Sequence, residues 1–231
     1  MIFFKFYNII FGISKKAGIE MANIFDLFKQ ISSDDSKKSG GAIEYLVVGL
    51  GNPGKEYERT RHNAGFMAIE YISGRCGVDV NRAKFSALVG ETTIAEKRVL
   101  LMKPQTFMNA SGEAVSAAAK FYKIPVENVI VISDDVSLDV GRVRVRRNGS
   151  HGGQKGLKSI AECLGSQEYK RIKIGVGAKP HPDYDMASWV LSEFSAQDVA
   201  AISENYGRIY DGLCKILQGD VDGAMQICNG K

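Results

Sequence analysis

The chain has 231 residues, enough for one domain with a substantial hydrophobic core, and nothing in its middle has the composition of a domain linker. Its formal net charge of +4 is too small to define a function, so the distribution of charge matters more than its sum. The four cysteines are scattered and form no C-x-x-C pair, which argues against a zinc site or a disulfide framework and favours a reducing cytoplasm.

Residues 1–41 differ in character from the rest of the chain. The first sixteen residues are apolar and aromatic, but Lys5 and Asn8 interrupt a run that is too short to span a bilayer, and no convincing cleavage site of a signal peptide follows. A second apolar segment begins after Met21, and a polar linker covers residues 32–41. Two hypotheses remain: Met21 is the true initiator, or residues 1–41 are an extension with a short amphipathic helix. Residues 42–231 are then the catalytic domain.

From residue 45 onward, expected strands and helices alternate. Strands are predicted from short apolar runs rich in β-branched residues, and helices from apolar residues that recur with helical period. The expected strands cover residues 45–48, 85–94, 98–102, 129–132, 142–146 and 171–176; the expected helices cover residues 64–75, 110–122, 154–164, 196–217 and 221–228. Residues 179–186 are expected to form a surface loop. The pattern predicts an α/β fold, a single-domain mixed β-sheet sandwiched by α-helices.

The first predicted strand ends in the segment GLGNPG, residues 49–54, which matches the G-x-G-x-x-G pattern of dinucleotide-binding turns. Such a turn requires a helix directly after the glycines, whereas the next helical period here begins near Ala64. We therefore expect an extended loop that presents Asn52 and His62 at the end of the strand. A nucleotide-dependent oxidoreductase is accordingly the weakest functional hypothesis.

His62 is the strongest candidate for acid–base chemistry among the three histidines. It lies at the carboxyl end of a predicted strand, the edge at which ligands gather in open α/β sheets. Asp134 follows another strand and could accept a hydrogen bond from one ring nitrogen, leaving the other nitrogen free to act as a base. Because these loops contain no G-x-S-x-G element and no cysteine, attack by a water that His62 activates is the simplest mechanism.

Amide and apolar side chains accompany this pair in the sequence. Asn52 and Asn109 can donate hydrogen bonds to a carbonyl or to a developing oxyanion, although an asparagine in a glycine turn also suits a purely conformational role. Phe107 and Met108 are expected either to line an apolar pocket or to belong to the core.

Basic residues concentrate between positions 142 and 179, where ten basic residues stand against two acidic ones, a balance of +8. Arg142, Arg144 and Arg146 would lie on one side of a strand because side chains alternate with period two. Such a row could follow a nucleic-acid backbone. The alternative is a solvated edge strand whose charges prevent aggregation.

Five segments occur in the following order: GLGNPGKEYERTRHNAG, KPQTFMNASG, the strand that ends in Asp134, GSHGGQKGLKSI and YKRIKIGVG. In content and order they resemble the bacterial peptidyl-tRNA hydrolases, over residues 45 to about 227. The resemblance implies hydrolysis of the ester between a peptide, or an N-blocked aminoacyl group, and tRNA, without a metal or cofactor. It also implies recycling of tRNA from prematurely released peptidyl-tRNA in the cytoplasm. We expect a monomer with no membrane span and no obligate protein partner.

The resemblance also assigns roles to individual residues. It makes His62 the catalytic histidine and Asp134 its partner acid, with Asn52 and Asn109 near the scissile bond. The residues expected to bind substrate are Tyr57, Phe107, Met108 and Lys155, and those expected to bind tRNA are Arg144, Arg146, Arg171 and Lys173. A non-catalytic RNA-binding relative on the same scaffold is the alternative, but it would not need all four catalytic residues.

Two positions depart from the family's pattern. The family's G-H-N-G element reads Gly153-Gln154-Lys155-Gly156 here, so an ammonium replaces the amide that binds the peptide backbone. An ammonium donates hydrogen bonds but cannot accept them, so the peptide-binding role of the amide is not carried over to Lys155, which could instead contact a tRNA phosphate. Lys173 stands where an arginine is expected, which keeps the charge but loses bidentate phosphate geometry.

Overall fold

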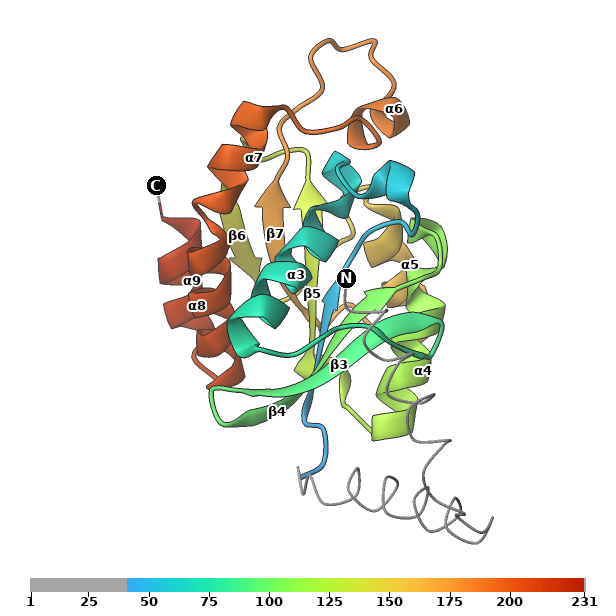
Figure 1. Ribbon diagram of the computed structural model, residues 1–231, viewed down its shortest axis with the longest axis vertical. Coiled ribbons are helices and arrows are strands. Elements are labelled where there is room, and N and C mark those ends of the chain that lie inside the picture. Colours follow the sequence, from blue (N-terminus) through green and yellow to red (C-terminus); the bar gives the residue numbers. More distant parts are fainter. Residues whose placement is uncertain (1–40, 231) are drawn as a thin grey trace, which may run out of the picture. The chain divides into compact units, whose positions relative to one another are not determined.

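A seven-stranded mixed sheet lies at the centre of residues 41–230, the part of the chain that the structure, a computed structural model, describes (Figure 1). Its strands are β1 (Tyr45–Gly49), β2 (Arg82–Lys84), β3 (Ala87–Ile94), β4 (Lys97–Pro104), β5 (Val129–Asp135), β6 (Val143–Arg146) and β7 (Lys170–Gly175). They are ordered β2-β3-β4-β1-β5-β7-β6. The central strands β4, β1, β5 and β7 are parallel, whereas the pairs β2–β3, β3–β4 and β6–β7 are antiparallel.

Helices cover both faces of this sheet. They are α3 (Ala64–Cys76), α4 (Ser111–Tyr122), α5 (Lys155–Leu164), α6 (Met186–Val190), α7 (Ala196–Ser203), α8 (Tyr206–Leu217) and α9 (Val221–Asn229). Helices α3, α8 and α9 pack on one face and α4 and α5 on the other (Figure 1). Because side chains alternate along a strand, β1 directs Val47 to the first face and Leu46 and Val48 to the second. The predicted sandwich of a mixed sheet between helices is confirmed.

The first turn of α3 contacts the ends of β1 and β5 through glycine backbone. A Cβ on Gly65 would lie 2.4 Å from the carbonyl oxygen of Ile132 and from the nitrogen of Leu50, and one on Gly49 would lie 2.3 Å from the oxygen of Gly65. Leu50 donates to Ile132 across 2.9 Å, and Phe66 donates to Leu50 across 3.2 Å. Because Gly49 and Gly65 have no side chains, the backbones approach closely, and the residues that precede α3 lie at the carboxyl ends of both strands.

The loop between β1 and α3 does not open a helix after its glycines. It contains two short 3₁₀ turns, Lys55–Tyr57 and Arg61–Asn63, and the α-helix begins only at Ala64. A dinucleotide-binding turn needs the helix N-terminus at the glycines. The predicted loop that presents Asn52 and His62 is confirmed, and the helix start that a dinucleotide-binding turn requires is not at the glycines.

The sequence pattern misses β2 and α6 and misplaces several boundaries. Phe85 and Ser86 have left-handed backbone conformations, with φ of 56° and 52°, and turn the chain between β2 and β3. The strand predicted from residue 85 therefore begins at Ala87. Strand β5 extends to Asp135, because its last residues still pair with β7. The predicted helix over residues 196–217 is divided into α7 and α8, and Asn205 bonds the carbonyl of Ala201 between them.

Two further expectations concern the N-terminal segment and membrane spans. The apolar segment predicted to be helical after Met21 lies outside residues 41–230, so its structure stays a prediction. Within residues 41–230, no helix combines the length and apolar character needed to cross a membrane.

The close contact between Gly65 and the backbone of Leu50 and Ile132 leads to a prediction about stability. The variant Gly65→Ala adds a Cβ that meets backbone atoms, and we expect the free energy of unfolding to fall by about 1–3 kcal/mol or more. The matched control is Gly74→Ala, later in the same helix, where an added Cβ meets nothing within 4 Å. It should raise stability by about 0.5–1 kcal/mol. Urea denaturation measures both, and a Gly65 variant as stable as the parent would contradict the close contact.

Candidate active site

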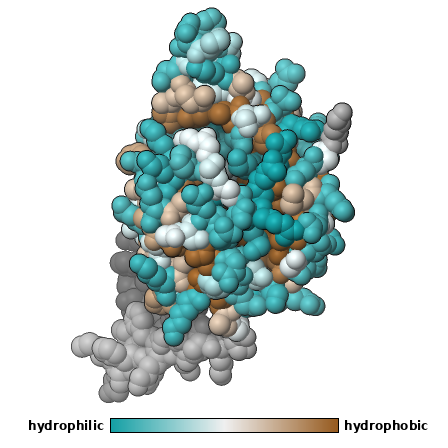
Figure 2. Space-filling view, turned by 180° about the vertical axis from the view of Figure 1, so that it is seen from behind, coloured by the Kyte–Doolittle hydropathy of each residue, from teal (hydrophilic) through white to brown (hydrophobic). Residues whose placement is uncertain are grey.

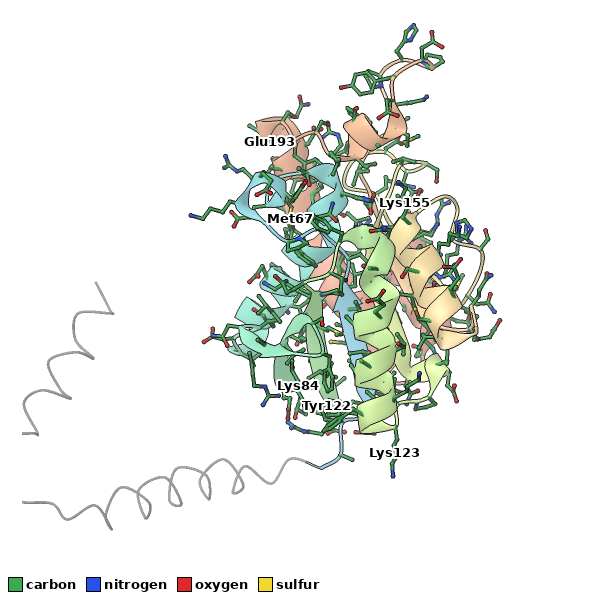
Figure 3. The ribbon with its side chains drawn as sticks, turned by 90° about the vertical axis from the view of Figure 1, so that its right-hand side faces the viewer. Met67, Lys84, Tyr122, Lys123, Lys155 and Glu193 are labelled. Atoms are coloured by element: carbon green, nitrogen blue, oxygen red, sulfur yellow. The ribbon has the colours of Figure 1, made fainter. Side chains whose placement is uncertain are left out.

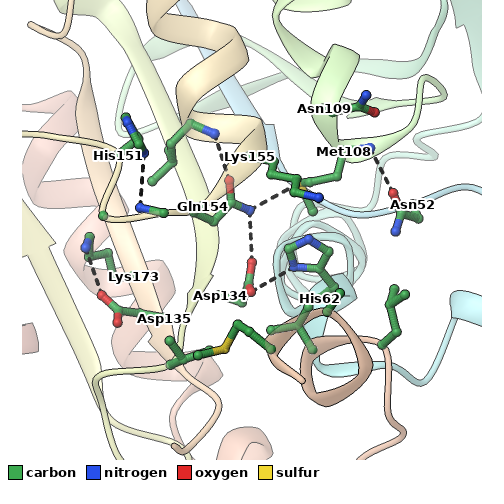
Figure 4. A pocket seen from close by; sticks show the side chains of 18 of the residues that line it. Asn52, His62, Met108, Asn109, Asp134, Asp135, His151, Gln154, Lys155 and Lys173 are labelled. Atoms are coloured by element: carbon green, nitrogen blue, oxygen red, sulfur yellow. Dashed lines mark hydrogen bonds and ion pairs between the residues drawn. The ribbon is translucent and has the colours of Figure 1, made fainter. Parts of the chain in front are cut away.

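A cavity of about 930 Å³ opens at the carboxyl ends of the central parallel strands (Figure 4). Its walls come from the loops after β1, β4 and β5, from the start of α5 and from α6. The predicted site residues that line it are Asn52, Tyr57, His62, Phe107, Met108, Asn109, Asp134, Lys155 and Lys173. Carboxyl ends of parallel strands meet at one edge of a sheet, which explains why such distant segments converge here.

The cavity has both polar and apolar walls. Lys155 lies at the start of α5, far from Lys84, Tyr122 and Lys123 at the opposite end of the domain (Figure 3). On the face that Figure 2 shows, apolar surface gathers just below the hydrophilic loop that projects at one end. The exposed Met186 and Leu191 of the α6 region belong to the cavity wall. These side chains give that part of the cavity an apolar wall.

His62 and Asp134 form a hydrogen-bonded pair in this cavity (Figure 4). Asp134 Oδ2 accepts a hydrogen bond from His62 Nδ1 across 2.8 Å, and the two side chains are 3% and 11% exposed. Among residues 41–230, no other hydrogen bond involves the imidazole, so Nε2 stays open. A ring that carries its proton on Nδ1 presents a lone pair on Nε2, which is the geometry of a general base.

Arg61 anchors the turn that carries His62. Its guanidinium donates to the Glu193 carbonyl across 3.1 Å and to Asp198 across 3.0 Å. It also lies 3.9 Å from the ring centroid of Trp189. Because the backbone nitrogen of Arg61 donates to the Ser192 carbonyl across 3.0 Å, the segment after β7 holds the His62 turn at several points.

Asn52 is held so that its amide N–H groups remain available. Asn63 accepts from the backbone nitrogen of Asn52 across 2.8 Å and donates to its carbonyl across 3.0 Å. The side-chain oxygen of Asn52 accepts from the Met108 nitrogen across 2.8 Å. The amide oxygen is thereby used, and Nδ2 remains to donate to a ligand in the cavity. The sequence analysis assigns no role to Asn63. Its position directly after His62 is the only feature of the sequence that could have pointed to one.

The remaining substrate candidates differ in burial. Asn109 is exposed at the rim, and its side chain makes no hydrogen bond within the described residues. Phe107 is 60% exposed, whereas Met108 is buried and forms part of the wall. The sequence left open whether Phe107 and Met108 line a pocket or belong to the core. The cavity includes both, and Met108 also belongs to the core beneath α4 and α5.

Gln154 is a site residue that the sequence did not single out. Its side-chain oxygen accepts from the backbone nitrogen of Leu157 across 2.7 Å and caps α5. Its amide nitrogen donates to Asp134 Oδ1 across 3.0 Å and contacts Met108 Sδ at 3.1 Å (Figure 4). The cap could be expected from the start of the helical pattern, but the contact with β5 depends on the fold.

Basic side chains continue from the cavity onto the sheet edge. Lys173 forms an ion pair with Asp135 at 2.8 Å and lies beside Arg144, its partner in the β6–β7 register. Partial burial raises the pKa of Asp135, but hydrogen bonds from Lys173 and Ser137 outweigh burial and hold this pKa below its ordinary value. Lys155 lines the cavity without an ion pair to any described residue.

The four predicted tRNA-binding residues do not share one environment. In β6, Val143 and Val145 are buried while Arg144 and Arg146 reach the surface, as the predicted alternation requires. Arg171 is only 1% exposed: its guanidinium donates to the Ser150 carbonyl across 2.8 Å and lies over the Tyr169 ring at 4.5 Å. Its guanidinium is occupied by these internal contacts and is not on the surface that Arg144 and Arg146 reach, so we leave Arg171 out of the proposed tRNA surface.

Comparison with known proteins finds relatives along nearly all of the described chain. The sequence profile of the family described as Peptidyl-tRNA hydrolase matches residues 46–231. A peptidyl-tRNA hydrolase of Caldicellulosiruptor bescii is 47% identical over 188 residues, covering 81% of this chain and 98% of that protein. One from Caldanaerobacter subterraneus subsp. tengcongensis is 48% identical over 186 residues, covering 80% and 100%. The crystal structure of peptidyl-tRNA hydrolase from Acinetobacter baumannii has a TM-score of 0.76 at 31% identity, covering 83% and 97%.

The two hydrogen bonds between the Asn63 side chain and the Asn52 backbone, which we call the Asn52 clamp, lead to a prediction about local order. In Asn63→Ala, both bonds to the Asn52 backbone are lost, and the free energy of unfolding should fall by about 1–3 kcal/mol. The Asn52 amide should also exchange with solvent faster, as hydrogen exchange would measure. Asn229→Ala is the matched control because Asn229 makes the same two bonds to the Val145 backbone, at 2.7 and 3.3 Å. Unchanged exchange at Asn52 in the Asn63 variant would contradict the clamp.

Proposed function

The chain belongs to the peptidyl-tRNA hydrolase family and hydrolyses the ester bond of peptidyl-tRNA, and we propose that His62 activates the attacking water. The observation that supports this role is the 2.8 Å bond from Nδ1 to Asp134, which leaves Nε2 open in the cavity. Asp134 fixes the tautomer and stabilises the imidazolium that forms when Nε2 takes a proton.

The proposed reaction has two steps. Water attacks the ester carbonyl carbon while His62 Nε2 takes a proton, and the carbonyl oxygen becomes an oxyanion. The tetrahedral intermediate then collapses: the bond to the ribose 3′ oxygen breaks, and the imidazolium returns the proton to that oxygen. Asn52 Nδ2 is the proposed oxyanion donor, a role worth roughly 10²–10³-fold in rate. Asn109, at the rim, is proposed to donate to the substrate near the scissile bond.

The rest of the cavity is proposed to bind the peptide and the acceptor end of tRNA. Phe107, Met108 and Tyr57 would surround the last peptide side chain, opposite the apolar α6 region. Lys155 has no acidic partner among residues 41–230, so its charge is available to a backbone carbonyl of the peptide or to a phosphate near the ester. The position of each side chain in one continuous cavity supports these assignments.

The proposed tRNA surface consists of Lys173, Arg144 and Arg146. The register places Arg144 directly beside Lys173, and Arg146 lies two residues further along the same side of β6. Phosphate contacts of this kind position a nucleic acid without reading its sequence, and their strength falls with salt. A non-catalytic RNA-binding protein is not favoured, because the matching relatives are peptidyl-tRNA hydrolases.

We place this activity in the cytoplasm, as the cysteine pattern predicts. The four cysteines are free thiols, which suits a reducing compartment. The expectation that the protein is a monomer without an obligate protein partner stays a prediction.

His62→Ala tests the proposed base. We expect kcat for an N-blocked aminoacyl-tRNA to fall by roughly 10²–10⁴-fold, while affinity for tRNA stays nearly unchanged because His62 contacts only the reacting ester. The control is His181→Ala, since His181 is exposed and lies outside the cavity. Hydrolysis and fluorescence titration with tRNA measure the two quantities. A loss of affinity as large as the loss of kcat would argue against a catalytic role.

Arg144→Ala and Arg146→Ala test the proposed tRNA surface. Each should weaken tRNA binding and reduce the slope of log Kd against log salt concentration by about 1, because one phosphate contact is lost. Lys215→Ala removes the same charge from α8, on the opposite face of the sheet, where Lys215 pairs with Asp220 at 3.3 Å. That control should keep the parent slope. An unchanged slope in both arginine variants would remove β6 from the interface.

A further inference from the structure

We propose that Gln154 is a positioning residue that holds the Asp134 carboxylate so that Oδ2 faces His62. The inference rests on the proposed catalytic pair and extends it by one member. Gln154 Nε2 donates to Asp134 Oδ1 across 3.0 Å, while Oδ2 accepts from His62 Nδ1 across 2.8 Å (Figure 4). The carboxylate is therefore bonded on both oxygens, by side chains from two different segments.

The orientation of the Gln154 amide is set by the helix that it caps. Its oxygen accepts from the Leu157 nitrogen across 2.7 Å, which satisfies an N–H group in the first turn of α5. An amide has one acceptor end and one donor end, so the nitrogen must face Asp134. A flipped amide would place its oxygen against the carboxylate and its NH₂ group against the Leu157 N–H. The start of α5 thus determines which group reaches the catalytic acid.

Asp134 depends on this donor because its carboxylate is almost fully buried. The Asp134 side chain is 3% exposed, and a buried carboxylate without hydrogen-bond donors is costly. Within residues 41–230, Gln154 gives Oδ1 its hydrogen bond and His62 gives Oδ2 its own. The last torsion of an aspartate is broad, so a carboxylate bonded on one oxygen only is free to turn. Removal of the Gln154 donor would leave Oδ1 unpaired and the His62 ring less firmly oriented.

The choice of glutamine has a chemical consequence. An imidazole in this place would donate from a given nitrogen only in one tautomer or when protonated. The amide of Gln154 carries its donor in every protonation state of the site. The bond to Asp134 in this chain is therefore independent of a second titrating group.

Two substitutions separate positioning from helix capping. Gln154→Ser keeps an N-cap acceptor for α5 but is too short to reach Asp134. Gln154→Glu keeps the length and the acceptor but places a carboxylate oxygen against Asp134 Oδ1. We expect kcat of the serine variant to fall roughly 10- to 100-fold with KM nearly unchanged, since a hydrogen bond to a charged group is lost. The glutamate variant should lose more. A residue that only caps the helix would leave both variants close to the parent.

A double-mutant cycle with Asp134→Asn supplies the second readout. If Gln154 acts through the Asp134 carboxylate, Gln154→Ser should cause little further loss of kcat in that background. An equal loss in both backgrounds would overturn the inference, and so would a parental kcat in the serine variant. Thermal unfolding checks that each variant is folded; if the serine variant is not, the glutamate variant decides.

The outcome also distinguishes this inference from the proposed function. A parent protein that does not hydrolyse peptidyl-tRNA would overturn both together. An active parent with fully active Gln154 variants would overturn only the positioning role.

Discussion

The contact between the first turn of α3 and the ends of β1 and β5 is the constraint on which the active site depends. Gly49 and Gly65 have no side chains there, so backbone atoms meet where any Cβ would clash. His62 precedes Gly65 by three residues and Asp134 follows the contacted Ile132 by two. The contact therefore sets the distance between base and acid, which are 72 positions apart in the chain and 2.8 Å apart in space.

Around this pair, the polar groups divide into those that hold the site and those that face the substrate. Asp134, Asn63 and Arg61 are buried and bonded to other protein groups, because a buried charge or amide without a partner is costly. Asn109 and Lys155 are exposed and make no bonds to other described side chains. Lys173 pairs with Asp135, whereas Lys155 has no acidic partner among residues 41–230, so its ammonium faces the cavity without an ion pair.

Sequence reasoning was most reliable where one element carries the information. The continuous apolar run of β5, the helical period of α3 and the position of His62 at a strand end all act within a few residues, and all appear as expected. It was wrong about the ends of elements that depend on pairing with a neighbouring strand or on an unusual turn. Strand β5 extends to Asp135 because β7 pairs with it, and the turn at Phe85 and Ser86 depends on left-handed backbone that neither residue type predicts. Arg171 was expected to bind tRNA, yet it occupies a buried position against Tyr169.

The sequence by itself determined the α/β class, the loop that carries Asn52 and His62, the acid at the end of a central strand and the resemblance to one family of hydrolases. Only the tertiary structure decided which groups support them: Asn63 on the Asn52 backbone, Arg61 on Asp198 and Gln154 on Asp134. The physical reason is range. Strand and helix patterns arise from forces between residues close in the chain, whereas these bonds join segments up to 137 positions apart and exist only after packing has fixed each rotamer.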